Sequence, residues 1–317
     1  MGNNVYLGID TSNYTTSLAL IGESGELIAN LKQPLTVRPG ERGLRQSEAV
    51  FAHTVNIPEI IKAVKPYIQD KNVLCIGVSD KPRNEQGSYM PCFLVGIAVA
   101  EALGAFLNKP VYRFSHQCGH IMAGIFSSER YDILSHPFGA FHVSGGTTEL
   151  VSAEYRNGEL HTEIVGETAD LNAGQVIDRI GVYLGMAFPA GAELERVALT
   201  NSAKIPRRKI SCVGGKVNLS GLENIAIKLY KDTGDVSLTG AFVFDYIGRA
   251  LVEMRNHYEA LRGETTFLYA GGVLCNSIIR EMLSKGRNDA FAVPQMSSDN
   301  AVGAAYLAKL KHNNGVF

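Results

Sequence analysis

The sequence predicts an α/β protein with two lobes related by internal duplication. An apolar strand that ends in small polar residues and turns back into a second strand occurs twice, about 130 residues apart, at residues 5–20 and 140–151. Each copy leads to a Gly-Glu-Leu corner, at Gly25–Leu27 and Gly158–Leu160. Around these copies, strands alternate with helices twice over, which is typical of an α/β fold built from a repeated unit.

The length and composition agree with two lobes. A chain of 317 residues is long for one hydrophobic core, and 45% hydrophobic with 19% charged residues is typical of a soluble globular protein. No low-complexity linker separates the halves, so we expect the lobes to share a central cleft. We place the first lobe at residues 1–114, completed by a C-terminal helix at 300–317, and the second lobe at 115–299.

The first half should contain a meander followed by alternating helices and strands. Residues 5–36 read as three strands, and a helix should begin at Ser47 because Phe51 and Val55 start an apolar stripe at helical spacing. The later elements of this half are expected to be a β-rich strand at Val73–Ser79, a helix with small residues at Val95–Leu107 and a short strand at Val111–Phe114 that leads to His116.

The second half repeats this order. The expected elements are a meander at 138–166, a helix at Asn172–Leu184, a helix at 191–201, a loop and strand at 206–213, a long amphipathic helix at Leu238–His257, a buried strand at Thr266–Ala270, a helix at Asn276–Leu283 and an Ala- and Gly-rich helix at Asn300–Lys311. We expect the last helix to pack back on the first lobe.

The global charge excludes some classes of function. A net charge of −1 and a pI near 6.7 do not describe a protein that binds nucleic acid with its whole surface, so RNA contacts would need a local patch or a partner. The densest basic cluster is Lys204–Lys209, which is either a solvated loop or such a patch. Five scattered cysteines, no apolar run long enough for a bilayer and no visible signal peptide lead us to expect a cytoplasmic protein with reduced thiols and no membrane contact.

The two repeated turns are the first candidates for binding. Turns of Gly, Ser and Thr let backbone N–H groups and hydroxyls approach an anion closely, because no large side chain intervenes. Two ordinary hairpins would also contain these residues, since they dominate turns in general. The repetition of the whole hairpin with its corner favours a pair of phosphate-binding turns.

A histidine pair is the sharpest local signal. His116 and His120 are four residues apart, so both imidazoles fall on one face of a helix and can point at one ion. Two histidines do not close a metal site, and Asp299, at a loop-to-helix junction, is a candidate third ligand whose alternative role is N-capping. Gln117 replaces the glutamate of an H-E-x-x-H metalloprotease, so this motif contains no general base.

Three further segments can hold a nucleotide. The Gly271-Gly272 turn after a buried strand leaves bare backbone for a base or ribose, with Asn276 as a hydrogen-bonding group. Asp178 can accept from ribose hydroxyls or pair with Arg179 or Arg196. Glu195, which follows a turn at 189–191, is either a ligand or a helix-surface carboxylate.

Together these segments resemble the TsaD family, the threonylcarbamoyl transferases of tRNA modification, whose fold is the duplicated actin-like ATPase fold of actin, Hsp70 and sugar kinases. The resemblance follows the length of the chain in order and spacing. The matching segments are Gly8–Ser12, Pro91–Gly96, His116–His120, Val143–Gly146, Gly174 with Asp178, Gly191 with Glu195, Ser220–Leu222, Gly271-Gly272 with Asn276, and Ser298–Ala301.

The resemblance implies a role for each site. It implies that one divalent ion, with Fe, Zn or Mg left open, is bound by His116, His120 and Asp299. It implies that an adenylate is held by Val143, Ser144, Gly145, Gly146, Thr147, Asp178, Gly191, Glu195, Gly272 and Asn276. We expect Asp10, Ser12 and Thr147, at the tips of the two turns, to lie where the acyl group reacts.

The implied activity is transfer of a carbamoyl or threonylcarbamoyl group from an acyl-adenylate to the exocyclic amine of a tRNA adenosine. A small-molecule amine as acceptor, or a non-catalytic nucleotide-binding partner subunit, are the alternatives. Family members work with partner subunits, so tRNA contacts through partners and a homo- or heterodimer with a related protein are expected.

The chain departs from the family pattern near the expected reaction centre. Asp10 stands where typical members have Glu, and Asn13–Thr16 stand where they have Cys and acidic residues. Thr147 replaces the histidine of Gly-Gly-His, Ala190 replaces a glycine, and Lys81–Met90 lack the Gly-Pro-Gly pattern. We therefore expect a divergent paralogue whose acyl group, acceptor or rate has changed.

Overall fold

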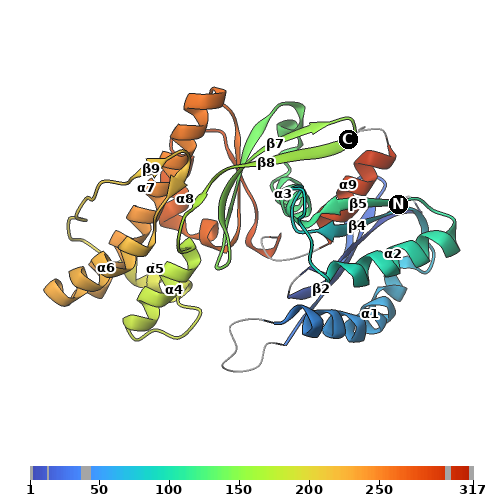
Figure 1. The fold of residues 1–317 in the computed structure, drawn as a ribbon, viewed down its shortest axis with the longest axis horizontal. Coiled ribbons are helices and arrows are strands. Elements are labelled where there is room, and N and C mark those ends of the chain that lie inside the picture. The colour runs from blue at the N-terminus through green and yellow to red at the C-terminus, as the bar shows by residue number, and fades with distance from the viewer. Residues whose placement is uncertain (1–2, 13, 37–43, 297–300, 314–317) are drawn as a thin grey trace. The chain divides into compact units, whose positions relative to one another are not determined.

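The computed structural model describes residues 3–12, 14–36, 44–296 and 301–313 (Figure 1). The chain divides into two compact units. The first unit comprises Met1–Ser135, Glu154–Thr162 and Gln295–Phe317, and the second unit comprises His136–Ala153 and Glu163–Pro294. This division differs from the predicted boundary after residue 114, because helix α3 (His116–Ser128) packs on α9 (Val302–His312) within the first unit.

Five strands form the sheet of the first unit over the described residues, in the spatial order β3-β2-β1-β4-β5. They are β1 (Asn4–Asp10), β2 (Thr15–Gly22), β3 (Leu27–Pro34), β4 (Asn72–Lys81) and β5 (Val111–Ser115). β1 to β3 form the predicted antiparallel meander, whereas β4 runs parallel to β1 and β5 parallel to β4. β1 is buried along almost its whole length, which explains its continuous apolar run.

Small residues allow the C-terminal helix to lie directly on this sheet. The first unit also contains α1 (Gln46–Ile68), α2 (Phe93–Leu107) and a short 3-10 helix at Tyr131–Ser135. The side of the sheet at Gly8 and Gly77 faces α9, and a methyl group at either glycine would meet the helix backbone, at the Ala301 and Ala304 carbonyls respectively. Gly303 in α9 likewise leaves room only for the backbone of α3. Figure 1 shows α9, in red, beside β4 and β5.

The second sheet, all of which except residues 154–162 belongs to the second unit, repeats the strand order of the first sheet. Its described strands follow the spatial order β12-β11-β6-β7-β8-β10-β9. They are β6 (Phe138–Val143), β7 (Thr148–Arg156), β8 (Glu159–Thr168), β9 (Cys212–Val213), β10 (Lys216–Val217), β11 (Phe267–Ala270) and β12 (Ala290–Phe291). β6 pairs antiparallel with β7 and parallel with β11, as β1 does with β2 and β4. The order β8-β7-β6-β11-β12 thus matches β3-β2-β1-β4-β5, and the predicted duplication is confirmed.

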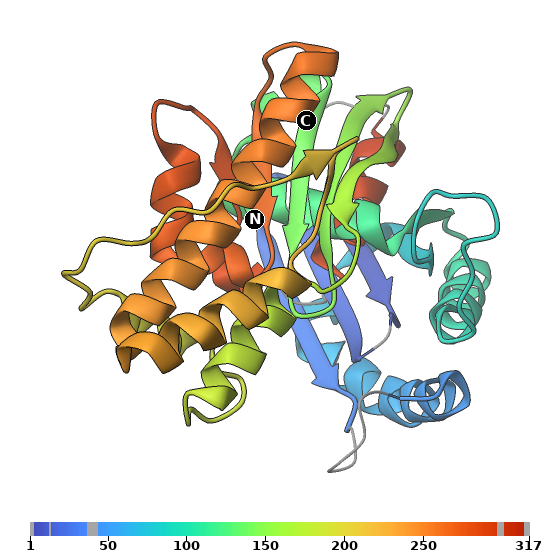
Figure 2. The ribbon, with the colours of Figure 1, turned by 60° about the vertical axis from the view of Figure 1, so that its left-hand side comes forward.

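Helices pack around this second sheet. They are α4 (Ala173–Tyr183), α5 (Gly191–Ala198), α6 (Ser220–Thr233), α7 (Val236–Arg262), α8 (Ser277–Ser284) and the short 3-10 helix at Gly272–Cys275. A further 3-10 helix, Pro294–Met296, begins at the last residue of the second unit and continues into the first. α6 was not expected from the sequence. Its apolar residues Leu222 and Ala226 are fully buried in the core of this unit, and the helix contacts α7 and α4 (Figure 2).

Both Gly-Glu-Leu corners need their glycine. Gly25 and Gly158 have φ values of +91° and +79°, a backbone conformation that residues with a Cβ rarely adopt. The two corners end the two matching hairpins, β2–β3 and β7–β8. In the described ranges, no helix combines the length and the apolar character needed to cross a membrane.

Candidate active site

The first candidate cluster lies at the carboxyl ends of the parallel strands of the first unit. Asp10 ends β1, Ser79 lies near the end of β4, and His116 follows β5. The Asp10 carboxylate accepts hydrogen bonds from the Ser79 hydroxyl and from the backbone N–H of Ser12, the latter at 2.8 Å. Its Oδ2 lies 2.8 Å from Nδ1 of His116. Ligands bind to open α/β sheets at this edge, so the cluster is placed where a site is expected.

The charge of Asp10 is stabilised by its neighbours. Burial alone would raise the pKa of this carboxyl group. The adjacent His116 ring and the hydrogen bonds from His116, Ser12 and Ser79 outweigh burial and hold the pKa of Asp10 below its usual range. Asp10 is therefore a carboxylate that orients the His116 ring through Nδ1.

The two histidines lie on one face of α3, as the spacing predicts. Their ring centroids are 4.3 Å apart and the ring planes are inclined by 71°. The donor set suits a divalent ion, because imidazoles are common ligands and a carboxylate partner commonly fixes the tautomer of a ligating histidine. Asp299, the predicted third ligand, lies outside the described residues. Among the residues that are described, no three His, Cys, Asp or Glu side chains form a group that could hold a metal.

The turn between β1 and β2 is anchored on α1. Thr16 is buried, its hydroxyl lies 2.8 Å from Nδ1 of His53, and the Asn56 amide donates to it at 3.2 Å. The hydroxyl of Ser12 is also buried, yet it has no hydrogen-bond partner in the described part of the chain. A buried orphan hydroxyl calls for an explanation, and a bound ligand group is one. Asn13 lies outside the described residues.

The second candidate cluster is the matching turn of the second unit. Residues 144–147 connect β6 and β7, and the turn is closed by a 2.8 Å hydrogen bond from Ser144 N–H to the Thr147 carbonyl. Gly145 and Gly146 are exposed, and a methyl group on either would touch nothing within 4 Å. Their backbone is therefore accessible to a ligand.

This turn sits at the N-terminus of α4. The N–H of Gly174 donates to the Ser144 carbonyl at 3.2 Å, and a Cβ on Gly174 would lie 2.7 Å from the Ser144 carbonyl and from Gly145. The N–H of Ala173 donates to the Thr148 hydroxyl at 2.9 Å. Exposed backbone next to a helix N-terminus is favourable for phosphate, because the N–H groups and the helix dipole both favour an anion.

The Gly271-Gly272 turn lies beside the same strand end. Gly271 has a φ of +109°, and a Cβ there would collide with the backbone of Val143. Gly272 is open, with nothing within 4 Å of the place where its Cβ would be. Asn276 caps α8 by accepting from Ile279 N–H at 3.0 Å, whereas its buried amide nitrogen has no partner among the described residues.

The two predicted acids connect these turns to α5. Oδ1 of Asp178 accepts from the N–H of Ala190 at 2.8 Å, so α4 holds the start of α5. The arginines proposed as its partners bind elsewhere, Arg179 to Glu223 and Arg196 to Glu193.

Glu195 accepts two hydrogen bonds from Ser277, from the backbone N–H at 2.7 Å and from the hydroxyl at 2.6 Å. It therefore links α5 to the start of α8, next to Asn276. The turns at 144–147 and 271–272 therefore lie in the same unit as Asp178, Gly191, Glu195 and Asn276.

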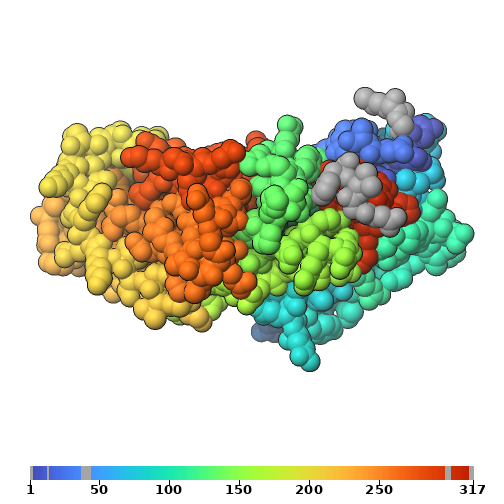
Figure 3. Space-filling view, turned by 90° about the horizontal axis from the view of Figure 1, so that it is seen from above, coloured from blue at the N-terminus to red at the C-terminus, as the bar shows by residue number. Residues whose placement is uncertain are grey.

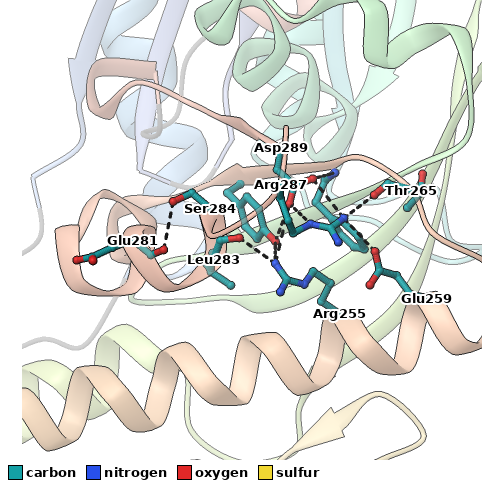
Figure 4. A network of polar contacts seen from close by, with 10 residues as sticks. Arg255, Glu259, Thr265, Glu281, Leu283, Ser284, Arg287 and Asp289 are labelled. Atoms are coloured by element: carbon teal, nitrogen blue, oxygen red, sulfur yellow. Dashed lines mark hydrogen bonds and ion pairs between the residues drawn. The ribbon is translucent and has the colours of Figure 1, made fainter.

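A buried ionic network supports the strand that carries the Gly-Gly turn (Figure 4). Asp289 accepts from the N–H of Phe267 at 3.0 Å and pairs with Arg287 at 2.6 Å. Arg255 in α7 donates to the Tyr269 hydroxyl at 3.2 Å and to the Leu283 carbonyl at 2.9 Å. These contacts fix β11 against α7 and α8, so the Gly-Gly turn begins from a rigid position.

One departure from the family pattern is explained by packing. The methyl group of Ala190 is fully buried and lies where a Cβ on Gly181 of α4 would be. An alanine is tolerated at this turn because its partner is a glycine.

Sequence reasoning missed Ser79 and Ser277. Ser79 lies near the end of the strand beside β1, so the rule that sites form at the carboxyl ends of parallel strands could have identified it. Ser277 carried no comparable signal, because its role depends on the approach of Glu195 from another helix.

The family model described as "TsaD: tRNA N6-adenosine threonylcarbamoyltransferase" matches residues 28–306. The chain belongs to the TsaD family. The match covers nearly all of β3, the strands from β4 to β12, the histidine pair, the turns at 144–147 and 271–272 and the beginning of α9, whereas β1, β2 and the turn between them precede it. The chain is therefore an acyltransferase-family member with the duplicated actin-like fold.

Two similar curated proteins from archaea span nearly the whole chain. A "Probable bifunctional tRNA threonylcarbamoyladenosine biosynthesis protein" of Methanocaldococcus jannaschii is 27% identical over 98% of this chain and 56% of its own length. A "tRNA N6-adenosine threonylcarbamoyltransferase" of Methanopyrus kandleri is 25% identical over 98% of this chain and 89% of its own length. The chain thus spans about half of the first relative and most of the second.

Solved structures share the fold. HypF from T. kodakarensis superposes with a TM-score of 0.65 at 12% identity, over 99% of this chain and 48% of that one. Component A of (R)-2-hydroxyglutaryl-CoA dehydratase from Acidaminococcus fermentans gives a TM-score of 0.53 at 14% identity, over 98% of this chain and 99% of that one. At these identities the likeness concerns the fold alone.

Proposed function

We propose that the protein transfers a carbamoyl or threonylcarbamoyl group from an acyl-adenylate to the exocyclic amine of a tRNA adenosine. Membership of the TsaD family and the names of its relatives support this reaction class. The observation that carries the proposal is the exposed Gly145-Gly146 backbone at the N-terminus of α4. A second open turn lies beside it, because Gly271 packs on the backbone of Val143 and Gly272 is open.

The second unit would hold the adenylate. The backbone of residues 143–147 would receive the phosphate, because its N–H groups and the start of α4 favour an anion. The open Gly272 and the unpartnered amide of Asn276 would receive the nucleoside. Asp178 and Glu195 already hold α5 and α8 in place, accepting one and two hydrogen bonds respectively. A carboxylate can accept about four, so both can also accept from ribose hydroxyls.

The first unit would hold a divalent ion through His116 and His120, with Asp299 as the third ligand in this proposal. Asp10 fixes the orientation of His116, and Ser79 in turn holds Asp10. The ion would supply Lewis-acid polarisation of the acyl carbonyl, which favours attack by a weakly nucleophilic amine. Ser12, with its buried orphan hydroxyl, is the residue of the first turn that we propose to donate to the acyl group.

The proposal is tested by the release of AMP. Purified protein with each of Fe²⁺, Zn²⁺ and Mg²⁺ is given carbamoyl-adenylate or threonylcarbamoyl-adenylate, with tRNA, with a small amine or with neither. We expect tRNA-dependent AMP release that is strongly reduced in His116→Ala and retained in His136→Ala, a matched control on an exposed histidine outside the pair.

The outcomes separate the alternatives. Release that needs a small amine and ignores tRNA would identify a metabolite carbamoyltransferase. No release with either adenylate under any condition, together with nucleotide binding, would identify a non-catalytic subunit and refute the transferase proposal. Equal release by the His116→Ala variant and the wild type would refute the role of the histidine pair.

We further propose that the chain works as a dimer with a related protein. Large apolar side chains remain exposed on two helices of the first unit, with Phe51 of α1 at 72% and Phe106 of α2 at 92% exposure. Exposed aromatic residues of this size favour a protein interface. Light scattering of the wild type and of Phe51→Ser tests this, and a monomer at all concentrations would exclude a homodimer.

A further inference from the structure

A strong local asymmetry of charge follows α5. The whole chain has 30 basic and 31 acidic residues, but no Asp or Glu occurs between Glu195 and Glu223. Six basic residues fall in this interval, namely Arg196, Lys204, Arg207, Arg208, Lys209 and Lys216. The near-neutral total therefore hides a stretch of purely positive charge in the second unit.

Four of these cations lie on a segment that has no regular secondary structure but is held in place. We call residues 204–209 the basic segment. Ile205 and Ile210 pack against the core of the second unit, and Arg249 of α7 donates to the Arg208 carbonyl at 2.7 Å. Figure 2 shows the chain leaving the helices after α5 and returning across α7 to β9. The basic segment is thus anchored at Ile205, at the Arg208 carbonyl and, just beyond its end, at Ile210, while its four cationic side chains are exposed.

The cations of the basic segment have no counter-ions in the described part of the protein. Their side chains are exposed, at positions 204, 207, 208 and 209, and none of them forms an ion pair or a side-chain hydrogen bond there. Neighbouring cations of the unit are paired instead, as Lys216 is with Glu167 at 2.7 Å and Lys228 with Asp232 at 3.0 Å. Figure 3 shows the region around residues 200–215, in yellow, at the surface of the second unit. Unpaired cations that lie close together create a positive potential, and this potential attracts a polyanion.

We propose that the basic segment binds the phosphate backbone of the acceptor RNA. This proposal rests on the proposed tRNA acceptor, and it assigns RNA contacts to the chain itself rather than to partner subunits alone. Two of the four cations are arginines, whose planar guanidinium groups match phosphate oxygens in pairs. The apolar residues of the segment face the core rather than solvent, which does not suit insertion into a lipid surface.

Contacts of this kind would position RNA without reading its bases. The basic segment follows α5 in the chain, the helix that carries Gly191 and Glu195. RNA held here would be bound by the same unit as the proposed adenylate.

The test measures tRNA binding by the purified chain over a series of salt concentrations. The loop variant is Lys204→Gln, Arg207→Gln, Arg208→Gln and Lys209→Gln together. The control variant removes the same charge from four exposed basic residues that already have partners, by replacing Lys62, Arg113, Lys216 and Lys228 with Gln. Each phosphate contact contributes about 0.7 to 0.9 to the slope of log affinity against log salt.

We expect the slope to fall by about 2 to 3 in the loop variant and by less than about 1 in the control. Arg207→Lys with Arg208→Lys should keep the wild-type slope, because the charge remains. AMP binding should be the same in all variants, which shows that the second unit is folded.

Equal slopes in the loop and control variants would overturn the proposal, because the effect would then come from total charge. Absence of tRNA binding by the wild type would also overturn it, as would binding of polyglutamate but not of tRNA. The transferase proposal is judged separately by tRNA-dependent AMP release in the wild type and His116→Ala, neither of which alters the basic segment, so the two proposals can fail separately.

Discussion

Replacing Gly174 by alanine tests whether the phosphate turn depends on its contact with α4. The new methyl group would lie 2.7 Å from the Ser144 carbonyl and from Gly145, and all of these neighbours are backbone atoms that cannot rotate away. The turn and the helix would have to separate. Such overpacking costs about 1 to 3 kcal/mol.

Gly221→Ala is a matched control for the loss of unfolding free energy in Gly174→Ala. Gly221 is, like Gly174, the second residue of its helix, but its Cβ would have nothing within 4 Å. Alanine is favoured over glycine within a helix by up to about 1 kcal/mol, and this gain applies to both variants. Gly174→Ala should therefore be less stable than Gly221→Ala by about 1 to 3 kcal/mol.

The assay combines urea unfolding with calorimetric titration of AMP. If the displaced turn carries the phosphate, a loss of about 1 to 2 kcal/mol weakens AMP binding by roughly 5- to 30-fold in Gly174→Ala, while Gly221→Ala binds as the wild type does. Equal stability and equal AMP affinity in the two variants would show that the turn does not need the helix, and the reasoning would be wrong.

Three further changes probe other parts of the structure. Gly8→Ala should lower the free energy of unfolding by about 1 to 3 kcal/mol, because the methyl group meets the α9 backbone. A free energy of unfolding within about 0.5 kcal/mol of that of Gly221→Ala, which is the usual scatter of surface substitutions, would contradict this packing. Asp289→Ala should cost about 3 to 5 kcal/mol in urea unfolding, since it leaves Arg287 without its closest carboxylate, and a loss below about 1 kcal/mol would show that Glu259 compensates. For Asp170, burial would raise the pKa, but hydrogen bonds from Ser220 and from the N–H groups of Leu219 and Leu171 lower it from 3.8 to about 2. The ionised carboxylate therefore stabilises the fold above pH 3.8 and this contribution is lost as the pH falls toward 2, so wild type and Asp170→Asn should differ at neutral pH and converge in acid. Parallel unfolding curves of the two proteins at all pH values would refute this linkage.

The duplicated strands could be predicted because their signals are local. Each strand is a short apolar run, and each corner contains the glycine that its positive φ requires. The histidine pair was predictable for the same reason, since a spacing of four residues on a helix fixes a common face.

Other parts depend on contacts between distant segments. The predicted boundary differs from the division into units, because nothing near Phe114 shows that α3 will pack on a helix about 180 residues later. The partners of Asp178 could not be chosen from sequence either. Arg179 is adjacent in the chain, yet on a helix adjacent residues point in different directions, and the backbone N–H of Ala190 binds the carboxylate instead.

The close fit of α9 on the first sheet has a consequence for how the chain acquires its structure. Val302–Leu310 are all buried, and they cover the face of β1 and β4 at Gly8 and Gly77. During synthesis, the strands of the first unit emerge first, but the helix that covers them emerges after the whole second unit. We therefore expect the second unit to complete its fold before the first, and a chain that stops before Val302 to expose an apolar sheet face prone to aggregation.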